Sequence, residues 1–154
     1  MDIDDYVSGP QLLRQTVAGM TQEQLVARPI PGKWSTLEVI CHLADFEIVF
    51  ADRIKRIIAE HEPTLFGGDP NQFAGRLAYH ERNAEEELLL ITLIRQQIAH
   101  ILRTLKPEDF QRRGLHSEYG PIILDAMIEH IAGHIPHHVQ FIEEKRKALG
   151  LAKA

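Results

Sequence analysis

The sequence predicts an all-α protein, a four-helix bundle with a long connection between its second and third helices. Two observations carry this prediction. Apolar residues recur every three or four positions in four long stretches, and proline and glycine residues separate those stretches. No segment alternates apolar and polar residues for long, so we expect essentially no β-sheet. With 154 residues and no internal linker or repeat, we expect one domain over residues 1–154.

The first helix is expected from about Asp5 to Met20, where leucines and other apolar residues follow a helical spacing. Thr21 and Gln24 then offer a capping box for a short helical turn that ends at about Ala27. Prolines and a glycine directly afterwards stop that turn.

The second long helix has the clearest start. Ser35 and Glu38 form a Ser-x-x-Glu capping box directly before a periodic apolar run that continues to about Glu60. The run defines one broad apolar face, which predicts burial. The connection from Glu62 to Tyr79 is long, and connections of this length are often functional.

The last two long helices are expected from about Asn83 to Leu105 and from just after Gly120 and Pro121 to about Leu149. Acidic residues at the start of the third and basic residues later suit a helix dipole. Proline is tolerated in a first helical turn, which places Pro121 at the start of the fourth.

Composition excludes several classes of function. A net charge of -5 without a dense basic cluster disfavours nucleic-acid binding. No apolar stretch is long enough to span a bilayer, and the acidic opening residues lack the zones of a secretory signal. The single cysteine, Cys41, excludes an internal disulfide framework. We therefore expect a cytoplasmic protein with neither nucleic-acid nor membrane partners.

Nine histidines are the unusual feature of the composition. His130, His134 and His138 follow one another at steps of four and so lie on nearly one face of the last helix. His134 and His138 can direct two imidazole nitrogens at one metal ion. A third ligand must come from another helix, and His42 is the best candidate because it lies beside the apolar face of the second long helix. His137 points about 100° away from His138 and is expected at a rim or an interface and not as a fourth ligand.

Three neutral imidazoles suit zinc, nickel, copper or iron and leave a coordination position open for water or substrate. Asp45 and Glu47 follow His42 closely and are candidates to orient an imidazole or to act as a base. His130, one turn from the pair, is a candidate for the same supporting role. The alternatives stay open, since a buried histidine is usually a hydrogen-bonded core residue and a helix carboxylate is usually solvated or ion-paired.

Two segments resemble the DinB-like superfamily of metal-dependent four-helix proteins: WSTLEVICHLADFE from Trp34 and GPIILDAMIEHIAGHIPHHVQFIEEKR from Gly120. The resemblance covers nearly the whole chain and implies that His42, His134 and His138 are metal ligands. Similar members include bacillithiol S-transferases and a mycothiol-dependent maleylpyruvate isomerase. In the isomerase branch a glutamate takes the place of His134, so the resemblance implies the three-histidine, bacillithiol-transferase-like branch. It also implies a homodimer.

The first functional hypothesis is an enzyme in which a divalent metal, zinc or nickel, activates a low-molecular-weight thiol against a small-molecule substrate. The alternative enzyme is a metal-dependent hydrolase that activates water, with Asp45 or Glu47 as base. A non-catalytic, metal-binding stress-response bundle is the third reading. In each enzyme, Tyr119 and the connection from Glu62 to Tyr79 are expected to set substrate specificity.

Overall fold

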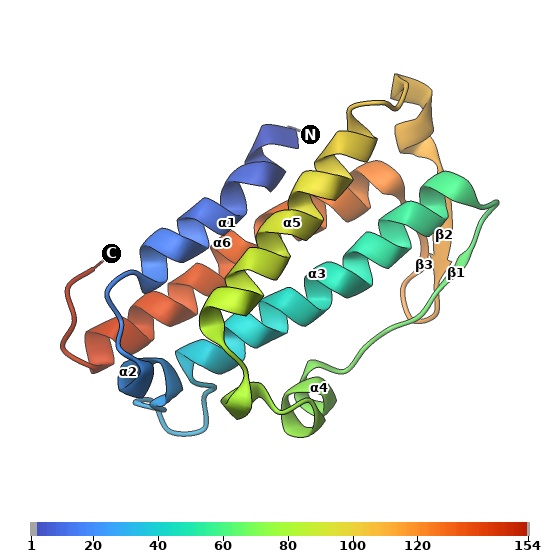
Figure 1. Cartoon of the computed structure of the whole chain (residues 1–154). Coiled ribbons are helices and arrows are strands. Elements are labelled where there is room, and N and C mark those ends of the chain that lie inside the picture. Colours follow the sequence, from blue (N-terminus) through green and yellow to red (C-terminus); the bar gives the residue numbers. More distant parts are fainter. Residues whose placement is uncertain (1–2, 154) are drawn as a thin grey trace.

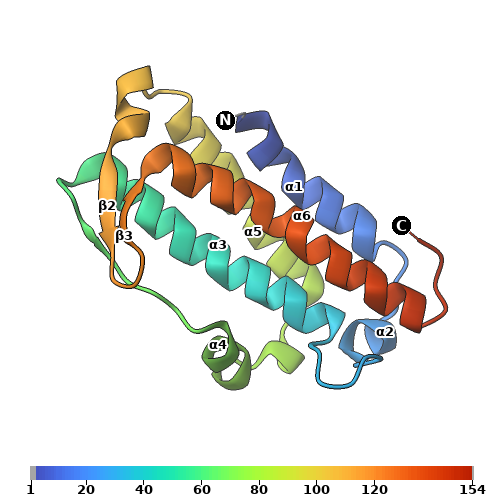
Figure 2. The ribbon, with the colours of Figure 1, turned by 180° about the vertical axis from the view of Figure 1, so that it is seen from behind.

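Four long helices form the body of the protein in the computed structural model, which describes residues 3–153 (Figures 1 and 2). They are α1 (Ile3–Val17), α3 (Thr36–Ala59), α5 (Ala84–Leu102) and α6 (Leu124–Ala148). Helices α1 and α3 each pack against both α5 and α6, so α1 and α3 occupy opposite corners of the bundle. The predicted four-helix bundle is confirmed. Within the described range, no helix combines the length and apolarity needed to cross a membrane.

Both predicted capping boxes are present. Thr21 caps the short helix α2 (Gln22–Val26), and its hydroxyl accepts a hydrogen bond from the backbone N–H of Gln24. Ser35 accepts from the Glu38 backbone N–H at 3.1 Å, while the Glu38 carboxylate accepts from the Ser35 N–H at 2.7 Å. These caps fix where α3 begins and therefore the direction in which its side chains project.

The expectation of no sheet is wrong. Three short strands form a small sheet at one end of the bundle: β1 (Thr64–Leu65), β2 (Arg113–His116) and β3 (Gly120–Ile123) (Figure 1). Strand β1 is parallel to β2, and β2 is antiparallel to β3. Because residues 120–123 pair with β2, α6 begins at Leu124 and not directly after Pro121.

A glycine allows the sheet to close against α3. A Cβ atom at Gly114 would lie 2.7 Å from Leu65 Cδ1 and 3.1 Å from Ile57 Cγ1. Any larger residue at this position would therefore push β1 or α3 away. Buried and exposed residues alternate along β2, but over four residues only. A period that short cannot be separated from chance in the sequence.

The long connection between α3 and α5 has structure of its own. After β1 the chain forms α4 (Pro70–Arg76) and the 3-10 turn η1 (Tyr79–Glu81) before α5 begins, and a second 3-10 turn, η2 (Pro107–Gln111), follows α5. The Asp69 carboxylate caps α4 by accepting from the backbone N–H groups of Asn71 and Gln72. The connection runs beside α3, so it can cover the side chains that α3 presents there (Figure 1).

A buried ion pair ties the four long helices together. Arg95 of α5 and Glu47 of α3 have side chains that are completely buried, and Arg95 Nε donates to Glu47 Oε1 at 2.7 Å. The same guanidinium donates to the carbonyls of Tyr6 in α1 and Ile131 in α6, at 2.7 and 2.9 Å. One side chain of α5 therefore contacts each of the three other long helices.

Candidate metal centre

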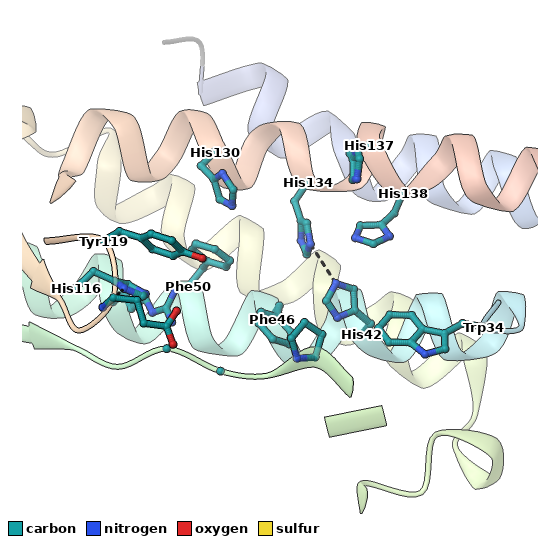
Figure 3. A pocket seen from close by; sticks show the side chains of 15 residues that line it. Trp34, His42, Phe46, Phe50, His116, Tyr119, His130, His134, His137 and His138 are labelled. Carbon is teal, nitrogen blue, oxygen red and sulfur yellow. Dashed lines mark hydrogen bonds between the residues drawn. The ribbon is translucent and has the colours of Figure 1, made fainter. Parts of the chain in front are cut away.

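Three histidines meet where α3 faces α6. His42 projects from α3, and His134 and His138 project from successive turns of α6 (Figure 3). One ring nitrogen from each histidine lies within 4.8 Å of the others, and His42 Nε2 lies 3.2 Å from His134 Nε2. The structure thus brings together the three residues that the sequence singled out.

The local structure explains this convergence. Helix α6 continues through Pro136, so His134 and His138 keep their spacing of one turn on one face. On α3, His42 belongs to the buried face and is only 4% exposed. Aromatic rings hold it in place, since the Trp34 and Phe46 rings lie 5.3 and 4.7 Å from its own.

The surroundings keep all three imidazoles neutral. Burial lowers the pKa of His42 and His138 to about 4 and that of His134 to about 2. The neighbouring histidines lower the pKa of His134 and His138 further, whereas the charge of Asp45 partly offsets the effect on His42. At neutral pH each ring therefore has a free lone pair, which is the form that binds metals.

The three rings fit a metal ion better than they fit an ordinary core. In the described part of the chain, Nδ1 of His42, His134 and His138 has no hydrogen-bond partner, so none of the three is held through this atom as a buried core histidine usually is. Two imidazole nitrogens on one tetrahedral zinc, each about 2.0–2.1 Å from the ion, would lie roughly 3.3 Å apart. The observed 3.2 Å between His42 Nε2 and His134 Nε2 matches that spacing.

A cavity of about 380 Å³ opens beside the three histidines. Its walls come from α3, α6, the β2–β3 turn and the connection after β1. Besides the three histidines, the lining residues are Trp34, Phe46, Phe50, Arg53, Gly67, Gly68, Pro70, His116, Glu118, Tyr119, His130 and His137. The centre is therefore open to a small molecule on one side (Figure 3).

The profile of the DinB superfamily matches residues 6–142. The chain belongs to the DinB superfamily. Its relatives include "Putative metal-dependent hydrolase OB0782" of Oceanobacillus iheyensis, which is 34% identical over 147 residues and aligns with 94% of this chain and 85% of its own length. YfiT of Bacillus subtilis, named in the same way, is 27% identical over 92% of this chain and 80% of its own length.

A solved structure supports the fold of this DinB protein. This protein is similar to the structure of Bacillus subtilis YfiT, which is described as a probable metal-dependent hydrolase with an unusual four-helix bundle topology. The TM-score is 0.90 with 25% sequence identity, and the match covers 97% of this chain and 86% of the YfiT chain. The names given to these relatives and the convergence of three histidines agree on a divalent metal.

The two carboxylates that follow His42 are engaged elsewhere. Asp45 pairs with Arg82, whose two Nη atoms donate at 2.9 and 3.0 Å, and Glu47 pairs with the buried Arg95. Neither carboxylate accepts a hydrogen bond from an imidazole of the centre, as the unpartnered Nδ1 atoms show for the described residues. In this DinB protein the rings are oriented by packing, and Asp45 acts on His42 only through its charge.

The two other histidines of α6, His130 and His137, lie around the centre. His130 is exposed and packs against Phe50, with ring centroids 5.4 Å apart, and it lines the cavity. His137 is also exposed and makes edge contacts with the rings of His138 and Phe141. Both therefore lie at the rim of the cavity.

Several cavity residues were not expected from the sequence, among them Phe50, Arg53 and His116. Phe50 and Arg53 could have been found, because they continue from His42 along one face of α3 at steps of four, four and three. His116 could not, because its position depends on β2, a strand that the sequence pattern does not reveal. Tyr119 and the connection after β1 do reach the cavity, as their expected role in specificity requires.

Proposed function

We propose that this DinB protein is a metal-dependent thiol S-transferase. In this proposal His42, His134 and His138 hold a divalent ion, zinc or nickel, and a low-molecular-weight thiol attacks an electrophilic small molecule in the adjoining cavity. The observation that carries the proposal is the convergence of three neutral imidazoles on the wall of an open cavity. A divalent metal bound there would supply Lewis acidity, which lowers the pKa of a coordinated thiol.

The distribution of carboxylates favours a thiol over water as the nucleophile. A base that takes its proton assists attack by water, but Asp45 and Glu47 are held in ion pairs with arginines. Glu118 is the only carboxylate among the cavity-lining residues, and it is exposed. A thiol ionises far more readily, so its proton can pass to solvent. The sulfur then forms a bond to carbon as the leaving group departs with its electron pair.

The thiol would come from solution and not from the chain. Cys41 is completely buried, and its Sγ donates to the Tyr79 carbonyl at 3.6 Å. Burial raises the pKa of the Cys41 thiol to about 12, so it stays protonated at neutral pH. It therefore has the properties of a small core residue.

Hydrolysis is the second candidate, and the observation that favours it is the naming of the relatives as metal-dependent hydrolases. Water would then replace the thiol as nucleophile. Since Asp45 and Glu47 are paired, His130 and Glu118 are the cavity residues that could accept its proton. A hydrolase would act without any added thiol, which separates the two candidates.

One experiment tests both candidates. Purified protein is loaded with zinc or nickel and given monochlorobimane, which becomes fluorescent when sulfur displaces chloride, together with cysteine, coenzyme A or bacillithiol. We expect metal-dependent conjugation that His42→Ala abolishes, with His100→Ala, an exposed histidine of α5, as the control. Thiol-independent cleavage of 4-nitrophenyl acetate would favour the hydrolase. Stoichiometric metal without either activity would favour a non-catalytic bundle.

We also propose that the protein acts in the cytoplasm as a homodimer. The single buried cysteine suits a reducing compartment. Cell fractionation tests the location, and recovery outside the cytoplasmic fraction would contradict it. Light scattering of the purified protein tests the assembly, and a monomer at micromolar concentration would contradict the dimer.

A further inference from the structure

A second cavity, of about 260 Å³, adjoins the one at the histidine centre. The two share part of their lining, so a ligand can extend from one into the other. The shared residues are Phe50, Arg53, His116, Tyr119 and His130. Ile122, Ala126 and Met127 complete the smaller cavity, which therefore has one permanent cation, no carboxylate and a largely apolar wall.

Arg53 is a buried cation without a full set of partners. Arg53 is only 7% exposed, and one of its Nη atoms donates a hydrogen bond to the Phe66 carbonyl. Its Nε is buried and has no hydrogen-bond partner among the described residues. Nearby Asp52 pairs with Arg56 instead. The charge of Glu118 acts on Arg53 and partly offsets the effect of burial on its pKa, but Glu118 lines only the larger cavity. A guanidinium remains protonated even though burial lowers the pKa of Arg53.

His116 supplies a second donor beside Arg53. It is 6% exposed, and its Nδ1 accepts a hydrogen bond from the backbone N–H of Glu118 at 3.2 Å. Burial and the charge of Arg53 lower the pKa of His116, so the ring is neutral at pH 7 and the accepting Nδ1 has no proton. The proton is then on Nε2, which is a hydrogen-bond donor. The Tyr119 ring packs against this imidazole, with centroids 4.8 Å apart.

Phe50 connects this pair of donors with the metal centre. The Arg53 guanidinium carbon lies 5.1 Å from the centre of the Phe50 ring, and the His134 ring lies 6.2 Å from it. A ligand that packs on Phe50 can therefore have one end near Arg53 and the other near the three histidines.

We infer that the smaller cavity binds the carboxylate end of an electrophilic substrate whose apolar body packs against Phe50 and Met127. A carboxylate offers two coplanar oxygens, which suit the Arg53 guanidinium, with one Nη atom used in the bond to Phe66, and Nε2 of His116. The apolar wall suits the body of the electrophile better than it suits a polar thiol. This inference rests on the proposed function, because the reacting end of the ligand must reach the centre formed by His42, His134 and His138.

A purely structural role for Arg53 explains less. The bond to the Phe66 carbonyl anchors the connection after β1, but it uses a single donor of the guanidinium. Burying the charged Arg53 side chain with Nε unpartnered costs free energy. A neutral side chain could donate the same hydrogen bond to the Phe66 carbonyl at a lower cost. An anionic ligand in the adjoining cavity would offset the cost of burying the positive charge of Arg53.

The test compares 3-phenylpropanoate with 3-phenylpropanamide, which has the same shape without the charge. Binding is measured by calorimetry on metal-loaded protein and on protein stripped of metal. We expect the acid to bind roughly tenfold or more tightly than the amide in both forms, since hydrogen bonds to charged groups are the stronger ones. Arg53→Gln should abolish this preference, and Arg53→Lys should retain part of it.

Control variants make the outcome decisive. Arg113→Gln removes an exposed arginine of the same sheet, which is paired with Glu62, and should leave the preference intact. If Arg53→Gln fails to fold, His116→Gln provides the test in its place. It is a milder change, and it should weaken binding of the acid. A preference that survives Arg53→Gln, or that disappears only when the metal is removed, would overturn the inference. Because binding is also measured without metal, loss of thiol transfer alone would contradict the proposed function and not this subsite.

Discussion

The bundle buries two polar clusters that both involve α3 and α6, and their hydrogen bonding differs. In the first, Arg95 donates to Glu47 and to two backbone carbonyls, and the Tyr6 hydroxyl donates to Glu47 at 3.3 Å. In the second, the three imidazoles of the candidate metal centre have Nδ1 atoms without partners among residues 3–153. The first cluster is complete within the chain, whereas the second leaves ring nitrogens without a partner in the described residues.

The comparison shows that burial alone does not identify a functional residue. Glu47 is more buried than His42, yet its partners account fully for its presence. What marks the histidines is the combination of burial, neutral rings and missing partners beside a cavity. Arg53 is also buried beside a cavity with an unpartnered nitrogen among the described residues, but it keeps its charge.

The largest expected effect comes from breaking the complete cluster. Arg95→Met would leave the Glu47 carboxylate buried without its cation, and we expect a loss of about 3–5 kcal/mol in the free energy of unfolding. Urea unfolding of metal-free protein measures it. Arg103→Met removes an exposed arginine paired with Asp4 and should cost less than about 1 kcal/mol. A similar small loss for Arg95→Met would contradict the structural role of that cluster.

The incomplete cluster should respond to metal instead. His134→Ala is expected to abolish stoichiometric zinc while changing the stability of metal-free protein by less than about 1 kcal/mol. With free metal at about 100 times its dissociation constant, wild-type protein should gain about 2.7 kcal/mol and the variant nothing. Metal analysis and thermal unfolding with and without zinc check this, with His100→Ala as control. Retention of zinc by His134→Ala would refute the ligand assignment.

The neutral histidines also predict a dependence on pH. Their pKa values in the folded protein lie well below 6.5, so between pH 6.5 and about pH 4 the unfolded chain binds more protons than the folded one. Metal-free protein should therefore lose stability as the pH falls from 7 to 5.5. His134→Gln should remove about 1 kcal/mol of that loss. An unchanged loss in the variant would show that His134 is not held neutral by burial.

The long helices and the histidine triad were predictable because each depends on local spacing. A capping box at Ser35 and an apolar face fix the orientation of His42, and a step of four fixes that of His134 relative to His138. The sheet was not predictable, because its strands have only two to four residues and β1 pairs with β2 across about fifty positions of sequence. His116 and the second cavity depend on that pairing.

The supporting role considered for Asp45 and Glu47 shows a further limit. Glu47 is five residues from His42, about 140° around the helix, so it faces the other helices. Asp45 is close to His42 in space, but Arg82, from the segment before α5, pairs with it. Nearness in sequence identified the candidates, while long-range partners decided what they contact.

Asp45→Asn has the smallest expected effect, and it separates a role through charge from a role through hydrogen bonding. If Asp45 acts on His42 only through its charge, zinc affinity should change by less than about threefold, because no hydrogen bond to an imidazole is lost. Arg82 keeps Glu87 as a partner, so the variant should fold. A carboxylate that orients a metal-binding histidine would instead give a loss of about 10–100-fold. Competition titration with a zinc chelator separates these outcomes, and the larger loss would make Asp45 part of the metal centre.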